Sequence, residues 1–132
     1  MGGMKFLLDT HVLLWWWGEA QRLSPRILAL LRNSANEVYV SSASAWEIAT
    51  KYRIGTLPSG GAIIAQWAER IAIDRFIELP IVAVHALRAG GLPGEHRDPF
   101  DRMLAAQSLV EGLPLASVDK ALSALGAELL WE

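Results

Sequence analysis

Four acidic residues stand where short apolar runs end or where helices are expected to begin: Asp9, Glu47, Asp101 and Asp119. If their carboxylates meet, two like charges about 4 Å apart repel by on the order of 4 kcal/mol at an effective dielectric of ~20. A bound cation would offset that repulsion. Because the chain has no cysteine and only three histidines, an all-oxygen site suits Mg²⁺ or Mn²⁺ rather than zinc. The four acids therefore indicate a candidate metal site.

The stretch at residues 98–107 is typical of a helix start. Asp98 can cap the helix, and Pro99 suits its first turn because the fixed φ of proline is helical. A negative charge at Asp101 is favoured there by the helix dipole. At helical spacing Asp101 shares a stripe with Leu104, so its carboxylate leans toward buried surface, where an acid needs a cation partner.

Each acid also has a purely structural interpretation. Asp119 could be only the N-cap of the last helix, and Asp98 fits a cap better than a ligand. Asp9 could make a turn after a strand, and helix glutamates such as Glu47 are most often solvated. Spacing alone leaves both interpretations open.

The elements that must position these acids follow from the apolar pattern. It predicts strands at residues 6–8, 38–40, 76–79, 115–117 and 128–131. It predicts helices at residues 12–17, 24–33, 41–55, 62–74, 81–89, 98–112 and 119–125. This alternation indicates parallel βαβ units in one α/β domain over residues 1–132. In such a sheet, ligands bind beyond the carboxyl ends of the strands, at a topological switch point.

Three consecutive tryptophans, Trp15, Trp16 and Trp17, pose a geometric problem for the first helix. At about 100° per residue they fan over roughly 200° of the helix surface, so one core face does not accommodate all of them. We expect at least one to help form a protein–protein interface, and we expect a homodimer.

Composition limits the remaining classes of function. The 132 residues are 52% hydrophobic and 20% charged, with a net charge of −2, which predicts one folded domain without a global basic field. No apolar run approaches the ~20 residues that span a bilayer, and the N-terminal apolar run is too short for a signal peptide. We therefore expect a cytoplasmic protein with no membrane partner. No glycine-rich phosphate loop is present, so nucleotide-cofactor chemistry has no support.

Four stretches, in order, carry a resemblance that covers nearly the whole chain: FLLDTHVLLW at 6–15, SSASAWEIATK at 41–51, HRDPFDRMLAAQ at 96–107 and SVD at 117–119. The sequence resembles a PIN-domain protein, and more narrowly a VapC-type toxin of a toxin–antitoxin pair. The resemblance implies a three-layer α/β/α fold with a central parallel sheet of about four to five short strands. It also implies a metal-dependent endoribonuclease that uses Mg²⁺ or Mn²⁺ and has RNA as substrate and an antitoxin protein as partner.

The family's acidic residues carry over to Asp9, Glu47, Asp101 and Asp119, of which the last occupies the family's most variable position. Asp98 fits the pattern of the VapC-type subgroup but does not occupy one of the family's acidic ligand positions. We therefore expect Asp98 to support the metal ligands without binding the metal itself. We expect Asp9 and Asp101 to be the principal ligands, and Glu47 and Asp119 to hold waters or a second ion.

Further candidates flank these acids: Thr10, His11, Ser42, Lys51, Asp98, Arg102 and Ser117. His11 could touch the scissile phosphate or be structural, and Lys51 could pair with Glu47 one helical turn away or bind phosphate. Arg102 could meet RNA or face solvent. The serines could orient carboxylates, with Ser42 alternatively a helix cap.

Two other functions compete with the nuclease. A receiver-like phosphoacceptor domain would carry adjacent acids after its first strand, whereas Thr10 and His11 follow Asp9. A non-catalytic PIN-like module that binds RNA or protein is the second alternative, and the presence of all four acids argues against it.

Overall fold

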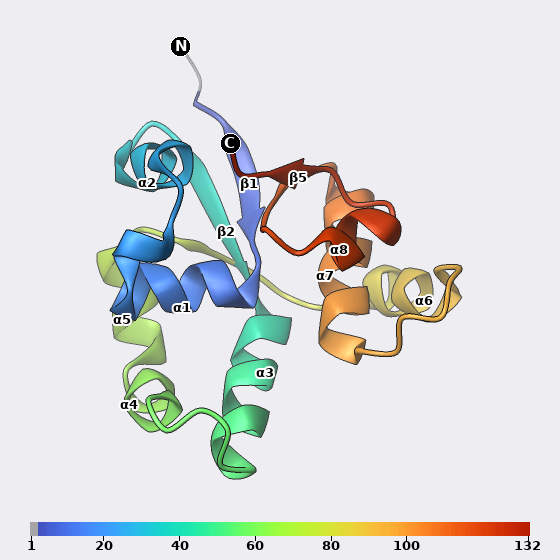
Figure 1. Cartoon of the computed structure of the whole chain (residues 1–132), viewed down its shortest axis with the longest axis horizontal. Coiled ribbons are helices and arrows are strands. Elements are labelled where there is room, and N and C mark those ends of the chain that lie inside the picture. Colours follow the sequence, from blue (N-terminus) through green and yellow to red (C-terminus); the bar gives the residue numbers. More distant parts are fainter. Residues whose placement is uncertain (1–2) are drawn as a thin grey trace.

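A parallel sheet of five short strands forms the centre of the computed structural model, which describes residues 3–132 (Figure 1). The strands are β1 (Lys5–Leu8), β2 (Glu37–Ser41), β3 (Ile77–Leu79), β4 (Leu115–Ala116) and β5 (Leu129–Leu130). Their order in the sheet is β3-β2-β1-β4-β5. The chain builds the sheet outward on one side of β1 and then returns to build the other side. The switch point of the sheet therefore lies between β1 and β4, and the predicted α/β fold is confirmed.

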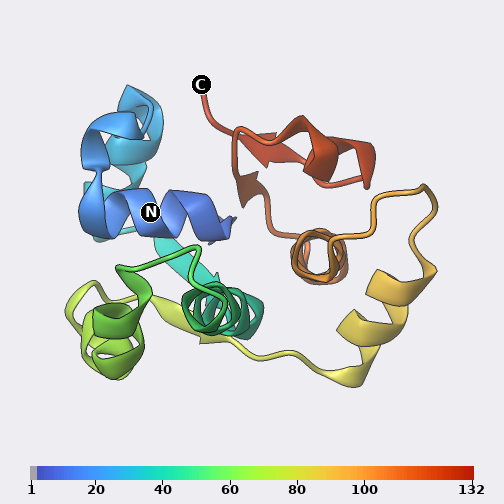
Figure 2. The same ribbon diagram turned by 60° about the horizontal axis from the view of Figure 1, so that its bottom comes forward.

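Helices pack on both faces of this sheet because successive strand residues point to opposite sides. On one face, Phe6 and Leu8 join a core with α1 (Thr10–Gly18), α2 (Pro25–Arg32), α4 (Gly60–Ala65) and α5 (Trp67–Ile73). On the other, Leu7 joins a core with α6 (Ala83–Gly91), α7 (Pro99–Glu111) and α8 (Lys120–Ala124). Figure 2 shows these two groups of helices on opposite sides of the molecule.

The helix α3 (Ser42–Arg53) contributes to both cores, through Ala43 on one side and Ile48 on the other. It begins, like α1, at the carboxyl end of the neighbouring strands β1 and β2 (Figure 1). Within residues 3–132, no helix is both long and apolar enough to cross a membrane.

Side-chain caps define where most of the site-bearing helices begin. Asp9, Ser24, Asp98 and Asp119 each accept a hydrogen bond from a backbone N–H in the first turn of the following helix. The cap of α3 is Ser41, whose hydroxyl accepts from the backbone N–H of Ala43 at 2.9 Å. Of the two roles considered for Ser42, that of helix cap is wrong, because the extended backbone of β2 continues through Ser41 and helical geometry begins at Ser42.

The helix predicted at 62–74 is two helices, separated at Gln66, whose φ of −109° and ψ of 13° interrupt the helical run. The two halves dock on different surfaces. In α4, a Cβ on Gly60 would lie 3.0 Å from the Cβ of Tyr52, so this helix packs closely against the end of α3. In α5, Trp67 meets Trp17 edge to face with ring centroids 5.8 Å apart. A single straight helix does not serve both contacts.

The three consecutive tryptophans are all half-buried and find different partners within the chain. The indole N–H groups of Trp16 and Trp17 both donate to Asp74 Oδ2, at 3.1 and 2.7 Å. Trp15 points elsewhere and meets Trp131 edge-on, with ring centroids 6.1 Å apart. The fan is therefore accommodated by intramolecular contacts, and an interface role for one of these tryptophans stays a prediction.

Candidate active site

Asp9 occupies the switch point of the sheet. It follows β1 directly, and its backbone N–H donates to the carbonyl of Ala116 in β4 at 3.0 Å. Its side chain is 4% exposed, and Ser117 Oγ donates to Asp9 Oδ2 at 2.7 Å. Burial raises the pKa of Asp9 above its ordinary value of 3.8, while the Ser117 hydrogen bond opposes that shift and the charge of Glu47 reinforces it. Among the described residues, no cation lies within ion-pair distance of Asp9.

Glu47 enters the same region from α3 and is only 3% exposed. One helical turn later, Lys51 Nζ donates to Glu47 Oε2 at 2.5 Å. Burial of the ammonium acts to lower the pKa of Lys51, but the bond to Glu47 and the charges of Asp98 and Asp101 outweigh it and raise that pKa. Lys51 therefore pairs with Glu47, as the spacing of four residues allowed, and also interacts electrostatically with Asp98 and Asp101 at the start of α7.

Asp101 sits in the first turn of α7 and is half-buried. Burial raises the pKa of Asp101, and the charges of Asp98, Asp9 and Asp119 raise it further, against a hydrogen bond from His96. The Nε2 of His96 lies 2.8 Å from Asp101 Oδ2. The charge of Glu47 acts on Asp9, and the charges of Asp9 and Asp119 act on Asp101, so a chain of electrostatic interactions connects the four predicted acids.

Asp98 and Asp119 both cap helices, which is the structural role that the sequence suggested for them. Asp98 Oδ1 accepts from the backbone N–H groups of Phe100 at 2.9 Å and Asp101 at 3.3 Å. Asp119 Oδ1 accepts from Ala121 at 2.9 Å, and the side chain of Asp119 is exposed. Each cap uses Oδ1, so capping leaves the second carboxylate oxygen outside these bonds.

Comparison with known proteins decides the family. The PIN domain family model matches residues 6–128. The chain belongs to the PIN domain family. It is similar to Ribonuclease VapC22 of Mycobacterium tuberculosis, with 29% identity over 117 residues that cover 88% of each chain.

Three solved structures share the PIN fold. They are VapBC2 from Rickettsia felis bound to a DNA fragment from their promoter (15% identity, TM-score 0.69), FitAcB from Neisseria gonorrhoeae (20%, 0.64) and VapBC-1 from nontypeable Haemophilus influenzae (13%, 0.66). The similarity covers 98%, 96% and 96% of this chain, and 100%, 96% and 97% of the respective matched chains. At these identities the structures establish the fold alone.

Two buried polar contacts hold the helices of the PIN domain that carry the acids. Thr10 Oγ1 and Ser44 Oγ lie 2.8 Å apart and link α1 to α3. Ser41 Oγ donates to Gln107 Oε1 at 2.5 Å and links the start of α3 to α7. These contacts fix Glu47 relative to Asp9 and Asp101. Gln107 was not predicted as a site residue, because its role depends on the packing of α7 against the end of β2.

The remaining sequence candidates have distinct surroundings. Arg102 donates to three backbone carbonyls, those of Ala89 and His96 at 2.9 Å each and that of Leu92, so its guanidinium holds the loop before α7 rather than facing solvent. His11 is exposed beside Asp9, and Ser42 is half-buried in the first turn of α3. His96 lies in the loop before α7, and the fold of that loop brings its Nε2 to Asp101.

The donor set of this PIN domain fits a hard divalent cation. Four carboxylates, among them a buried Asp9 with no cation in ion-pair distance, match the oxygen ligands that Mg²⁺ and Mn²⁺ prefer. Over residues 3–132, no three acidic or histidine side chains are disposed as a ready-made metal site. The side chains explain why, since Glu47 is turned to Lys51 and Asp101 to His96.

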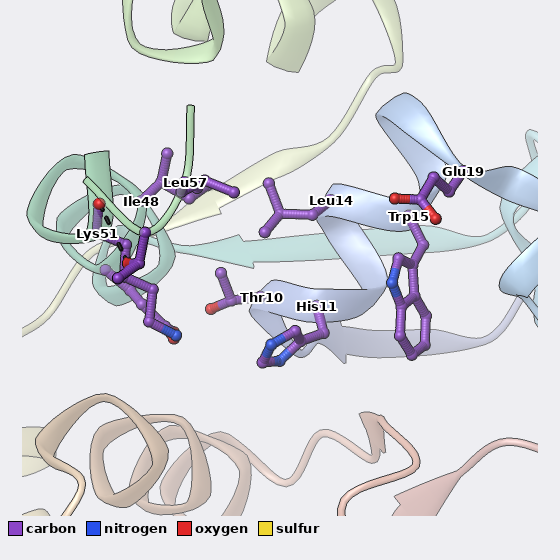
Figure 3. A pocket seen from close by; sticks show the side chains of 10 residues that line it. Thr10, His11, Leu14, Trp15, Glu19, Ile48, Lys51 and Leu57 are labelled. Atoms are coloured by element: carbon purple, nitrogen blue, oxygen red, sulfur yellow. Dashed lines mark hydrogen bonds and ion pairs between the residues drawn. The ribbon is translucent and has the colours of Figure 1, made fainter. Parts of the chain in front are cut away.

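A cavity of about 330 Å³ opens beside the acids, between α1 and α3. Figure 3 shows Thr10, His11 and Trp15 on one side of it and Lys51 and Leu57 on the other. Glu47 also lines this cavity, so it is continuous with the acidic site.

Proposed function

We propose that this PIN domain is a Mg²⁺- or Mn²⁺-dependent endoribonuclease and the toxin of a toxin–antitoxin pair. The observation that carries the proposal is Asp9, a buried carboxylate with no cation within ion-pair distance at the switch point of the sheet. Its charge interacts with those of Glu47 and Asp101, and Asp119 acts in turn on Asp101. The similarity to a protein named Ribonuclease VapC22 supports RNA as the substrate.

The side chains have separate roles in this proposal. A metal ion bound by Asp9 and Asp101 would lower the pKa of a water and neutralise charge on the phosphate that is attacked. Ser117 keeps Asp9 Oδ2 in one orientation through its 2.7 Å hydrogen bond. Glu47 and Asp119 would hold waters or a second ion.

Two nitrogen-bearing side chains contact the acids of the site, and one of them, Lys51, neutralises part of its charge without a metal. Lys51 pairs with Glu47, and His96 contacts Asp101. Both side chains are on the same edge as the acids, so each could also donate to phosphate oxygens of RNA. This supports Lys51 and His96 as RNA contacts less directly than it supports the acids as ligands.

The test is cleavage of single-stranded RNA by the purified protein with Mg²⁺ or Mn²⁺, with and without EDTA. We expect Asp9→Asn to abolish metal-supported cleavage while circular dichroism shows an intact fold. Glu69→Gln, an exposed glutamate on α5, is the charge-matched control and should cleave like the natural protein. Full activity of Asp9→Asn would refute the ligand assignment, and metal-independent RNA binding without cleavage would favour the non-catalytic module.

We propose further that residues 1–132 form a single PIN-like domain that acts in the cytoplasm and associates with an antitoxin protein and with a second copy of itself. The names VapC and VapBC among the similar proteins support the antitoxin. Exposed apolar side chains on α3 and α6, among them Trp46 and Leu87, support a homodimer. Sedimentation equilibrium tests the dimer, and a monomer at high concentration would contradict it.

A further inference from the structure

The cavity between α1 and α3 has a composition that metal chemistry does not require. Three apolar side chains line it, those of Leu14, Ile48 and Leu57. Its polar lining groups include the indole of Trp15 and the carboxylate of Glu19. We propose that this cavity binds the base of a nucleotide that flanks the cleaved phosphodiester, and that Trp15 and Glu19 select that base. The inference rests on the proposed ribonuclease function.

The position of the cavity supports a nucleotide next to the reacting phosphate. Thr10, Glu47 and Lys51 line the cavity and also belong to the acidic site. A phosphate held at the acids would therefore have its neighbouring nucleoside beside these side chains. Lys51 provides a positive charge for the connecting backbone.

Trp15 offers the cavity a hydrogen-bond donor that has no acceptor within residues 3–132. The indole N–H groups of Trp16, Trp17 and Trp67 donate to carboxylates, whereas the described residues give those of Trp15, Trp46 and Trp131 no acceptor; of these three, only Trp15 lines the cavity. In Figure 3 the nitrogen-bearing edge of the Trp15 ring is turned toward the cavity. Contacts with Trp131 and with the guanidinium of Arg22, 5.8 Å from the ring centroid, hold the indole in this orientation.

Glu19 supplies the complementary acceptor. Its carboxylate lines the cavity and is held by Arg22, with Arg22 Nε 2.6 Å from Glu19 Oε2. The other oxygen, Oε1, is not part of that ion pair. A donor and an acceptor beside apolar walls can bind the edge and faces of a planar base, which is how single-stranded RNA is commonly recognised.

The volume and the charges favour a base over a protein segment. About 330 Å³ is at the lower end of the range of small-molecule sites, which is roughly 300–1,000 Å³. A carboxylate accepts hydrogen bonds from the exocyclic amino groups of guanine, cytosine and adenine, and uracil has no such group. We therefore expect the site to favour an amino-bearing base over uracil by about tenfold in kcat/KM at the position that contacts Glu19.

The first arm of the test measures cleavage of a single-stranded RNA in which one position at a time is abasic or uridine. We expect a loss of about tenfold in kcat/KM at one nucleotide next to the cut, and smaller effects elsewhere. Glu19→Gln should abolish the discrimination against uridine at that position, because an amide can donate as well as accept. Glu69→Gln removes the same charge from an exposed site on α5 and should keep the discrimination. Equal rates for all substrates would overturn the proposal.

The second arm does not depend on cleavage. The indole ¹H–¹⁵N resonance of Trp15, assigned with Trp15→Phe, is followed while GMP, CMP, AMP or ribose 5-phosphate is added. We expect the nucleotides to shift this resonance, ribose 5-phosphate to leave it in place, and Glu19→Gln to weaken the shift. A resonance that no nucleotide moves would overturn the proposal, and apolar peptides moving it instead would identify a protein-docking groove. Absence of RNA cleavage would count against the nuclease alone, since this arm reports on the cavity directly.

Discussion

Ser117 Oγ donates a hydrogen bond of 2.7 Å to Asp9 Oδ2 across 108 positions of sequence. The contact exists because β1 and β4 are neighbours in the sheet, so the residues that follow them meet at one edge. Ser117 Oγ also accepts from the backbone N–H of Asp119 at 3.0 Å. One hydroxyl thus connects a buried acid, Asp9, to the segment that carries an exposed one, Asp119.

Replacing this hydroxyl should weaken metal binding. In Ser117→Ala, Asp9 loses its only side-chain hydrogen-bond donor among the described residues, and its carboxylate is free to rotate. We expect metal affinity and metal-supported RNA cleavage to fall by about 10- to 100-fold, the range seen for groups that orient metal ligands. Isothermal titration with Mn²⁺ measures the affinity. Ser123→Ala, on the exposed side of α8, is the control, and equal affinities of the two variants would contradict the role of Ser117.

The raised pKa values of Asp9 and Asp101 predict a pH-dependent stability of the metal-free protein. Both values lie above the ordinary 3.8, so between the unfolded and folded pKa the native state binds more protons than the unfolded state. Stability from these groups is complete below pH 3.8 and is lost as pH rises through the folded values. Urea unfolding in EDTA should therefore show that the free energy of unfolding of Asp9→Asn rises relative to that of the natural protein as pH increases from 4 to 8. A constant difference would contradict the burial of a charged Asp9.

A divalent cation should offset the destabilising effect of the charged Asp9 and Asp101 carboxylates on the native state. Binding to the native state alone stabilises by about 2.7 kcal/mol at a concentration 100 times Kd. Thermal unfolding with increasing Mg²⁺ or Mn²⁺ should show a rising Tm for the natural protein and for Glu69→Gln. Asp9→Asn should show little increase, and an equal increase in all three proteins would place the ion elsewhere.

Arg102 should prove structural rather than RNA-binding. Arg102→Ala removes a charged donor from three backbone carbonyls and should cost about 3 kcal/mol of unfolding free energy. Arg102→Lys should rescue little, because one ammonium group does not reproduce the guanidinium fork. Urea denaturation measures both, with exposed Arg97→Ala expected within about 0.5 kcal/mol of the natural protein. If Arg102→Ala left the free energy of unfolding unchanged, Arg102 would again be a candidate for RNA contact.

Asp74 should stabilise the tryptophan-rich helix. Asp74→Ala leaves two half-buried indole N–H groups, those of Trp16 and Trp17, without their acceptor and should cost about 2 kcal/mol. Asp74→Asn keeps one acceptor oxygen and should cost less. Chemical denaturation distinguishes the two, and a gain of dimer in Asp74→Ala would show that the freed tryptophans can form an interface.

The sequence by itself determined the local features. Apolar runs separated by capping residues were enough to predict five strands, the start of α7 at Asp98 and Pro99, and its end at Gly112, whose φ of 66° suits glycine. These features depend on residues close together in the chain. The candidate acids followed from the same signals, because each stands at an element boundary.

Only the tertiary structure decided which boundaries meet. The strand order brings Ser117 to Asp9, and the loop before α7 brings His96 to Asp101. The split at Gln66 and the shared acceptor Asp74 likewise depend on surfaces supplied by distant segments. Spacing along a chain specifies the face on which a side chain lies, but contacts between elements also require their relative positions, which packing of the two cores determines.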